Sequence, residues 1–208
     1  ALRNVYDGLL AYHYASADPQ VLVPDLATSV PEPTDGGRTY TFNLRPGMGA
    51  VGGGGLRASG LGGGGVRAWR RGWRPGCCAG VVGGQDGVGD PASRDLGRGV
   101  VADYRAGRVT FRLVAPDPEF LYKLTLLLVP TPPETPLGRI TSPIPGTGPY
   151  RIASFTPKTA FTLERNGFFR QCSAPAQPVG FLDVITWIKV ADAHESAAAV
   201  QQGPADLS

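Results

Sequence analysis

The chain has 208 residues, which is enough for one or two ordinary domains with a sizeable core. Its apolar content of 42% is typical of a folded globular protein and excludes wholesale disorder. The formal net charge of +3 is a local property, because residues 49–79 contain five arginines and no acidic residue, while the rest of the chain has 15 basic and 17 acidic residues. General affinity for nucleic acid or for an anionic membrane is therefore not indicated.

Titratable and nucleophilic side chains form no recognisable reactive or metal-binding set. The three cysteines, Cys77, Cys78 and Cys172, give neither a disulfide framework nor a zinc spacing. The two histidines, His13 and His194, lack a second ligand at helical or hairpin distance. No acid–base pair, nucleophile elbow or Cys–His pair stands out. We therefore predict no enzyme activity, no cofactor and no metal.

Targeting signals are also missing from the sequence. No run of 18 apolar residues predicts a transmembrane helix, and no signal peptide is visible at the start. The chain begins without Met and stops abruptly, so we expect both ends to be cut from a longer protein. The excess of Arg over Lys indicates a G/C-rich bacterial gene.

The first 48 residues read as ordinary folded sequence. Residues 24–27 are predicted to form a compact turn or the start of a short helix. Residues 35–37, Asp-Gly-Gly, give a strong turn signal. Apolar and polar residues then alternate over 39–44, which predicts a strand with one buried face.

Residues 49–79 are anomalous in composition. Two runs of four glycines would lose too much backbone entropy inside a helix or strand. The stretch uses mainly residue types that G/C-rich codons encode, so we hypothesise a gene read briefly in the wrong frame. A flexible Gly/Arg linker is the rival interpretation, and an RNA-binding Arg/Gly segment is a weaker third. A phosphate loop is disfavoured, because no Gly-Lys-Ser/Thr follows the glycines.

Alternating patterns return after residue 80. Residues 108–113 predict a strand that follows a turn at Ala106-Gly107. Residues 120–124 predict a short helix that the chain enters through proline. The Pro-rich residues 129–145 predict a loop.

The last third of the chain predicts a hairpin, a further strand and a helix. A strand starts at residues 148–152, and after a turn residues 161–165 return as its partner. Residues 183–190 are rich in β-branched and aromatic side chains, which favour a strand. Asp192 is predicted to cap a helix with Glu195 as its capping-box partner, and Gly203 to end it.

Four stretches in this order resemble solute-binding family 5 of ABC importers, the oligopeptide-, dipeptide- and nickel-binding proteins. They are Val5-Tyr6-Asp7-Gly8-Leu9, similar to the family's opening strand; Val23-Pro24-Asp25-Leu26-Ala27-Thr28-Ser29 with Asp35-Gly36 and Tyr40-Thr41-Phe42-Asn43-Leu44-Arg45-Pro46-Gly47-Met48; Pro145-Gly146-Thr147-Gly148-Pro149-Tyr150-Arg151-Ile152 with Leu163-Glu164-Arg165-Asn166; and Phe181-Leu182-Asp183-Val184-Ile185 with Gln202-Gly203-Pro204-Ala205-Asp206-Leu207. The aromatic, Asp-Gly turn and helix that the family places after Met48 are absent, and the loss coincides with the start of the anomalous stretch.

The resemblance implies a fold class and a division of the chain. The class is α/β (α+β mixed), as the partial first lobe of a two-lobed, periplasmic-binding-protein-like (type II) fold. Residues 1–45 and 144–208 would contribute to the first lobe, and residues 46–143 would form a subdomain inserted into it. The second lobe of the family would lie beyond this chain.

The resemblance also implies the function and its site. The expected function is capture of a solute, most naturally a peptide, between two lobes for import through ABC permease subunits. The expected location is extracytoplasmic, either periplasmic or as a lipoprotein at the cell surface. The predicted ligand-binding residues are Tyr12, Tyr14, Gly146, Thr147, Gly148 and Tyr150. For each of them a role in the core, a turn or the surface is the rival interpretation.

Two other functions remain open at this point. The same fold can serve as a ligand-sensing module fused to a transcriptional regulator. Alternatively, the chain is a non-functional fragment or pseudogene product, because one lobe is missing and residues 49–79 interrupt the subdomain.

Overall fold

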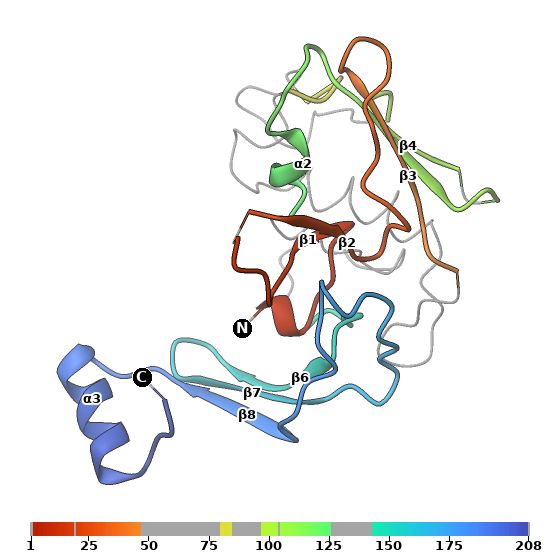
Figure 1. The fold of residues 1–208 in the computed structure, drawn as a ribbon. Coiled ribbons are helices and arrows are strands. Elements are labelled where there is room, and N and C mark those ends of the chain that lie inside the picture. Colours follow the sequence, from red (N-terminus) through yellow and green to blue (C-terminus); the bar gives the residue numbers. More distant parts are fainter. Residues whose placement is uncertain are drawn as a thin grey trace.

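The computed structural model describes residues 2–18, 20–46, 80–84, 97–103, 105–125 and 143–207. Within these residues the strands form three antiparallel sheets (Figure 1). The first contains β1 (Leu10–Tyr12) and β2 (Leu22–Pro24); the second has the order β3 (Thr39–Asn43), β5 (Arg108–Arg112), β4 (Val100–Asp103); the third has the order β6 (Tyr150–Thr156), β7 (Ala160–Arg165), β8 (Val184–Ile188). The helices are the 3-10 turn η1 (Leu2–Asn4), α2 (Phe120–Lys123) and α3 (Ala193–Gln202).

The main core lies between the second sheet and α2. Alternation along β3 turns Phe42 inward, and its ring meets Phe111 of β5 edge-on at a centroid distance of 5.7 Å. Phe120 of α2 then packs at 5.5 Å from Phe111 and 4.8 Å from Tyr40. All four aromatic side chains are buried, and for the three on β3 and β5 this is what the period of two predicts for a strand with one apolar face. The strands predicted over 39–44 and 108–113 are confirmed.

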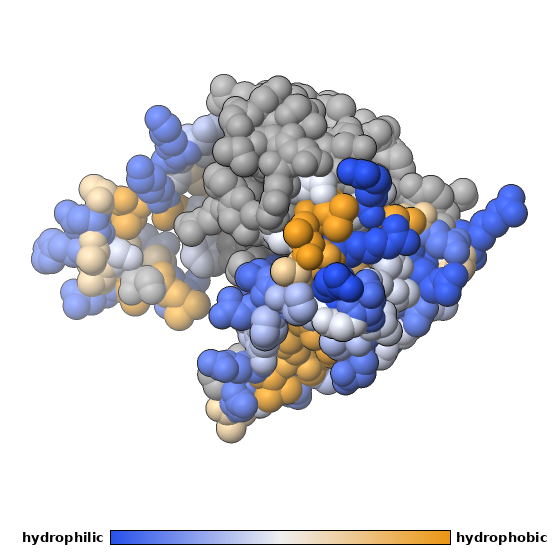
Figure 2. Space-filling model, turned by 90° about the horizontal axis from the view of Figure 1, so that it is seen from above, coloured by the Kyte–Doolittle hydropathy of each residue, from blue (hydrophilic) through white to orange (hydrophobic). Residues whose placement is uncertain are grey.

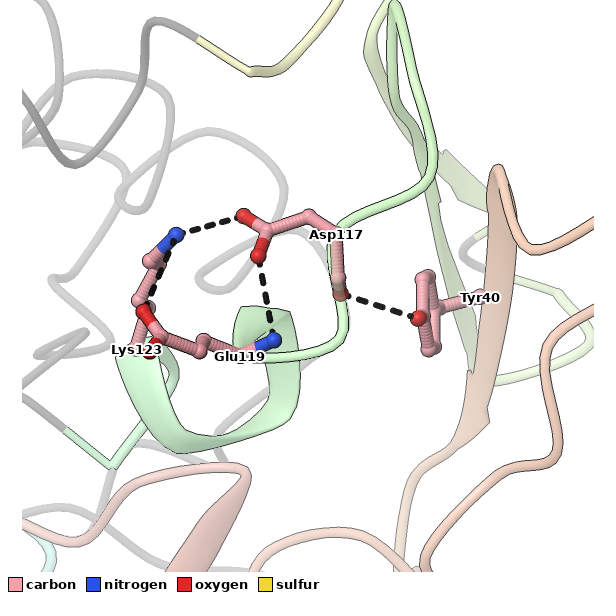
Figure 3. Close-up of polar contacts among 4 residues, drawn as sticks. All are labelled: Tyr40, Asp117, Glu119 and Lys123. Carbon is pink, nitrogen blue, oxygen red and sulfur yellow. Dashed lines mark hydrogen bonds and ion pairs between the residues drawn. The ribbon is translucent and has the colours of Figure 1, made fainter.

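A polar network fixes the entry into α2 (Figure 3). The Asp117 carboxylate accepts a hydrogen bond from the Glu119 N–H at 3.0 Å and lies 2.5 Å from Lys123 Nζ. The Asp117 carbonyl accepts from the Tyr40 hydroxyl at 3.4 Å, which joins the helix entry to β3. The short helix predicted here is confirmed.

The third sheet is a hairpin extended by one strand. β6 and β7 pair through a tight turn in which Lys158 has a φ of 63°, and β8 pairs with the other edge of β7. Leu163 and Tyr150 of this sheet are buried against Val5 and Tyr6 in a second, smaller core. The hairpin and the strand within residues 183–190 are confirmed. In Figure 1 the N-terminal segment therefore lies between the second and third sheets.

Helix α3 follows β8 and has the predicted ends. Asp192 Oδ1 accepts from the Glu195 N–H at 2.9 Å, and Gly203 ends the helix with a φ of 91°. Glu195 Oε2 accepts from the N–H of Ala191, one residue before the cap. No residue of α3 is buried, and the helix lies beyond the end of the third sheet in Figure 1. Figure 2 shows apolar (orange) atoms at the surface of this fainter, distant part of the molecule.

Some elements differ from the expectation. Residues 5–9 form no strand, because the N–H groups of Asp7 and Gly8 bond to the side chains of Thr147 and Asp25 and not to a neighbouring strand. The opening strand is instead Leu10–Tyr12. The compact turn expected at 24–27 is a bend between β2 and a bridge at Ala27.

Several features predicted from the sequence fall on other parts of the chain. The anomalous residues 49–79, with Cys77 and Cys78, lie outside the described residues, as do residues 129–142 of the Pro-rich loop.

Strands β2 and β4 were not predicted. In the part of the chain that the structure describes, no helix has the length and apolarity needed to cross a membrane.

Candidate functional site

A hollow of about 250 Å³ opens beside the N-terminal segment. Residues from four places along the chain line it: eight residues between Arg3 and Tyr14, together with Asp25, Thr125 and residues 176–178. Three tyrosine rings contribute to the walls, together with the Arg3, Asn4 and Gln177 side chains. A concave site with aromatic walls and a few polar groups has the general character of a small-ligand pocket.

The loop after β7 holds the N-terminal segment in place at this hollow. Gln177 Nε2 donates to the Arg3 carbonyl at 2.6 Å and to Asp7 Oδ1 at 3.1 Å. Ser173 Oγ donates to the Pro24 carbonyl at 2.6 Å. The N–H of Tyr14 donates to the Pro175 carbonyl at 3.1 Å. One loop therefore supports both η1 and the β1–β2 hairpin.

Two of the predicted ligand-binding residues, Tyr12 and Tyr14, line the hollow. The Tyr12 ring lies 5.6 Å from the Arg3 guanidinium carbon and 6.4 Å from the ring of Tyr122. Tyr14 has 61% of its surface exposed, so its ring is available to a ligand without any rearrangement. An exposed tyrosine beside a hollow is a common contact in binding sites, because it offers a rigid apolar face and a hydroxyl.

The other four predicted residues, Gly146, Thr147, Gly148 and Tyr150, lie together on a different side of the N-terminal segment and do not line the hollow. The Gly148 N–H donates to the Val5 carbonyl at 2.9 Å, and a Cβ on Gly146 would lie 2.1 Å from the same oxygen. This close approach of two backbones requires glycine.

Thr147 and Tyr150 complete this contact region. Thr147 Oγ1 accepts from the Asp7 N–H at 3.3 Å. The buried Tyr150 hydroxyl donates to the Leu182 carbonyl at 2.9 Å and accepts from the Leu182 N–H at 3.1 Å. In the structure, these four residues position the segment that carries the hollow.

Two buried carboxyl groups next to the hollow were not singled out from the sequence. Asp7 and Asp25 are each 3% exposed. Asp25 Oδ2 accepts from the Gly8 N–H at 3.2 Å, but Asp25 Oδ1 is buried with no hydrogen-bond partner. Their only signal in the sequence is that each stands inside a stretch that carries the family resemblance.

Burial changes the protonation of this carboxyl pair. It raises the pKa of Asp7 to about 6, although hydrogen bonds from Thr147 and Gln177 lower it. Burial and then repulsion from Asp7 raise the pKa of Asp25 to about 8, while the Gly8 N–H and Arg45 lower it. A protonated Asp25 carboxyl also suits the oxygen that lacks a donor, because it then carries no buried negative charge.

Neither a metal nor an activated thiol is indicated in this region. Among the residues described, no cluster of three or more His, Cys, Asp or Glu side chains could hold a metal. Burial, followed by repulsion from Asp25 and Asp7, raises the pKa of the Cys172 thiol to about 11. The thiol is therefore neutral near pH 7 and a poor nucleophile.

Several solved structures of peptide-binding proteins have a similar fold. The "Clavulanic acid biosynthesis oligopeptide binding protein 2" matches with a TM-score of 0.78 and 26% identity, over 97% of this chain and 38% of that chain. The pheromone receptor PrgZ matches with a TM-score of 0.78 and 18% identity, over 99% of this chain and 41% of that chain. OppA of Haemophilus influenzae, in complex with the peptide RPPGFSPFR, matches with a TM-score of 0.71 and 20% identity, over 98% of this chain and 39% of that chain. No family model and no curated protein matches the chain.

These matches confirm the resemblance that the sequence predicted. The chain has a mixed helix-and-sheet fold that corresponds to part of a periplasmic-binding-protein-like structure, and its structural neighbours are the family 5 solute-binding proteins of ABC importers. The chain spans about two fifths of the length of these neighbours. The neighbours are binding proteins and not enzymes.

Proposed function

We propose that this chain forms part of the ligand-binding lobe of an extracytoplasmic solute-binding protein that captures peptides for an ABC importer. The observation that carries the proposal is the match of 97% of the chain to an oligopeptide-binding protein with a TM-score of 0.78. In the proposed protein, a second lobe closes on the captured ligand and permease subunits receive it. Its location is the periplasm or the outer face of the membrane, where it is anchored as a lipoprotein.

The chemistry of the hollow supports a peptide ligand. Peptides offer backbone N–H and C=O groups at regular intervals, and the Asn4 and Gln177 amides can pair with either kind of group. Tyr12 and Tyr14 supply aromatic faces for side chains of varied shape, and Arg3 supplies a positive charge for a carboxylate. We assign ligand contact to these two tyrosines.

The remaining predicted residues have a supporting role in this proposal. Gly146, Thr147, Gly148 and Tyr150 hold residues 4–7 against β6 and thereby fix the wall of the hollow. Contacts of this kind, and the Gln177–Asp7 bond, also favour the division in which residues 1–45 and 144–208 belong to one lobe and residues 46–143 to an inserted subdomain.

Ligand-detected NMR with short peptides tests the proposal. Because the chain spans only part of its neighbours, we expect weak binding, with a Kd on the order of 1 mM. Saturation transfer to the peptides should fall by roughly half or more in Tyr14→Ala, since an aromatic contact contributes about 1 kcal/mol. Phe168→Ala is the matched control, because Phe168 is an aromatic residue outside the hollow that is 50% exposed, against 61% for Tyr14. A folded chain that binds no peptide, or equal loss in both variants, would contradict the proposal.

A further inference from the structure

The Asp25 carboxyl lies at the boundary between the hollow and the buried polar network beside it. Asp25 is one of the residues that line the hollow, yet it is only 3% exposed. Its Oδ2 accepts a hydrogen bond from the Gly8 N–H at 3.2 Å, and Gly8 also lines the hollow. Its Oδ1 is buried and receives no hydrogen bond from any described residue. One oxygen of this carboxyl therefore supports the wall of the hollow, while the other is unsatisfied.

Asp7 supports the same wall from the other side. Its Oδ1 accepts from Gln177 Nε2 at 3.1 Å, and the same nitrogen donates to the Arg3 carbonyl at 2.6 Å. Gln177 and Arg3 both line the hollow. The residue after Asp7 is Gly8, the donor to Asp25. The two carboxyl groups thus hold adjacent parts of one wall, and all of these contacts come from residues of this chain.

The charged and titratable groups around Asp25 come from several segments. Arg45, after β3, donates from Nε to the Asp25 carbonyl at 2.8 Å, and the Cys172 thiol donates to the same oxygen at 3.8 Å. Arg3 of η1 faces the hollow. Burial and the charge of Asp7 raise the pKa of Asp25 to about 8, although Arg45 lowers it. Because the pKa of Asp7 is about 6, Asp25 is neutral near pH 7 while Asp7 is ionised.

Ionisation of Asp25 therefore has a structural consequence. It places a second negative charge beside Asp7, in part on an oxygen that has no donor. A buried carboxylate without donors is strongly unfavourable, so the charge has to gain water. Because Asp25 lines the hollow, water can reach it from there, or the carboxylate can turn into the hollow and release the Gly8 N–H. Either change alters the volume that a ligand would occupy.

We propose that Asp25 is a proton-operated switch of the hollow, which accepts a ligand when this carboxyl is protonated and disfavours it when the carboxyl is ionised. The ligand side of this inference rests on the proposed peptide-binding function. A bound peptide keeps water away from Asp25, so peptide binding and retention of the proton favour each other. Affinity should consequently be constant below the midpoint of Asp25 and fall about tenfold between about pH 7 and pH 9.

Carbon-13 NMR of the aspartate carboxyl groups from about pH 5 to about pH 9 tests the switch without any ligand. Asp25 should titrate near pH 8, and at lower pH in Asp7→Asn, because the neighbouring charge is gone. Hydrogen exchange at the Gly8 N–H should accelerate through this midpoint more steeply than exchange in β5. Asp25→Asn should remove the excess, and Asp35→Asn, at an exposed turn, should keep it. Titration of Asp25 below about pH 5, or exchange at Gly8 that follows β5, would overturn the proposal.

Saturation-transfer NMR with short peptides, at about pH 7 and pH 9, tests the coupling to ligand. The wild type should lose about tenfold in affinity, and Asp25→Asn should bind equally at both values. Histidine also changes charge near neutral pH, and the His13 ring lies 6.3 Å from the ring of Tyr14, so His13→Gln is the control and should keep the wild-type loss. An equal loss in Asp25→Asn would overturn the coupling. Absence of peptide binding at either pH, with excess exchange at Gly8, would refute the peptide-binding function and still support the switch.

Discussion

The sheet of β3, β5 and β4 and the sheet of β6, β7 and β8 both consist of alternating antiparallel strands, but they bury their apolar side chains differently. In the former, Phe42 is fully buried and Phe111 is 4% exposed, and Phe120 of α2 packs against Phe111. In the latter, Trp187 is 47% exposed and Ile188 62% exposed, and α3 contributes no buried residue. The strand pattern is similar in both sheets, so the covering element decides how much a strand contributes to stability.

Truncation of one aromatic residue in each sheet should reveal this difference in burial as a difference in stability. Phe42→Ala should lower the free energy of unfolding by about 3–5 kcal/mol, because it removes a fully buried ring and leaves a cavity. Trp187→Ala should cost less than about 1 kcal/mol, since the residue is already 47% exposed. Urea denaturation measures both values. Equal losses would show that the third sheet is covered as well as the second.

Patterns within a few residues predicted most of the described strands and helices. The alternation over 39–44 and 108–113 was sufficient to predict two strands, and the cap at Asp192 was sufficient to predict the start of α3, because each pattern depends on local geometry. β4 was not predicted, since its four residues give too short a pattern to distinguish a strand from a loop. The exposure of β8 could not be predicted from its sequence either, because it depends on which element lies over the strand.

In the candidate site, too, local sequence patterns predicted some residues and missed others. Tyr12 and Tyr14 were predicted from their place in a family resemblance, and both line the hollow. The carboxyl pair was missed, because the burial of Asp7 depends on contacts with Thr147 and Gln177, which are 140 and 170 positions away in the sequence. No local pattern reports a contact at such a separation.

The carboxyl pair predicts an unusual dependence of stability on pH. Asp7 and Asp25 have raised pKa values of about 6 and about 8 in the folded chain, against 3.8 for an unperturbed Asp. Between the pKa of an unperturbed Asp and the raised pKa values, the folded state binds more protons than the unfolded state. The free energy of unfolding therefore falls as the pH rises from about 4 to about 8. The slope is at most about 1.4 kcal/mol per pH unit for each group.

Asp25→Asn isolates the contribution of this pair. The amide oxygen can still accept from the Gly8 N–H, but the residue carries no charge at any pH. Urea denaturation from pH 5 to pH 8 should give a flatter profile for this variant, which becomes more stable than the wild type at the alkaline end. Asp35→Asn, at an exposed turn, is the matched control and should keep the wild-type slope. A wild-type stability that rises with pH over this range would contradict the raised pKa values.

The smallest effect should come from the cap of α3, which tests whether this helix is coupled to the rest of the fold. Asp192→Ala removes the side-chain acceptor for the Glu195 N–H and should destabilise the helix by about 1 kcal/mol. Because no residue of α3 is buried, the loss should stay local. Hydrogen exchange should therefore accelerate in Ala193–Gln202 and remain unchanged in β5, and Asp206→Ala, an exposed residue after the helix, should change neither. An equal acceleration in β5 would mean that α3 supports the main core, and the contrast between the two sheets would then be smaller than their exposed surfaces indicate.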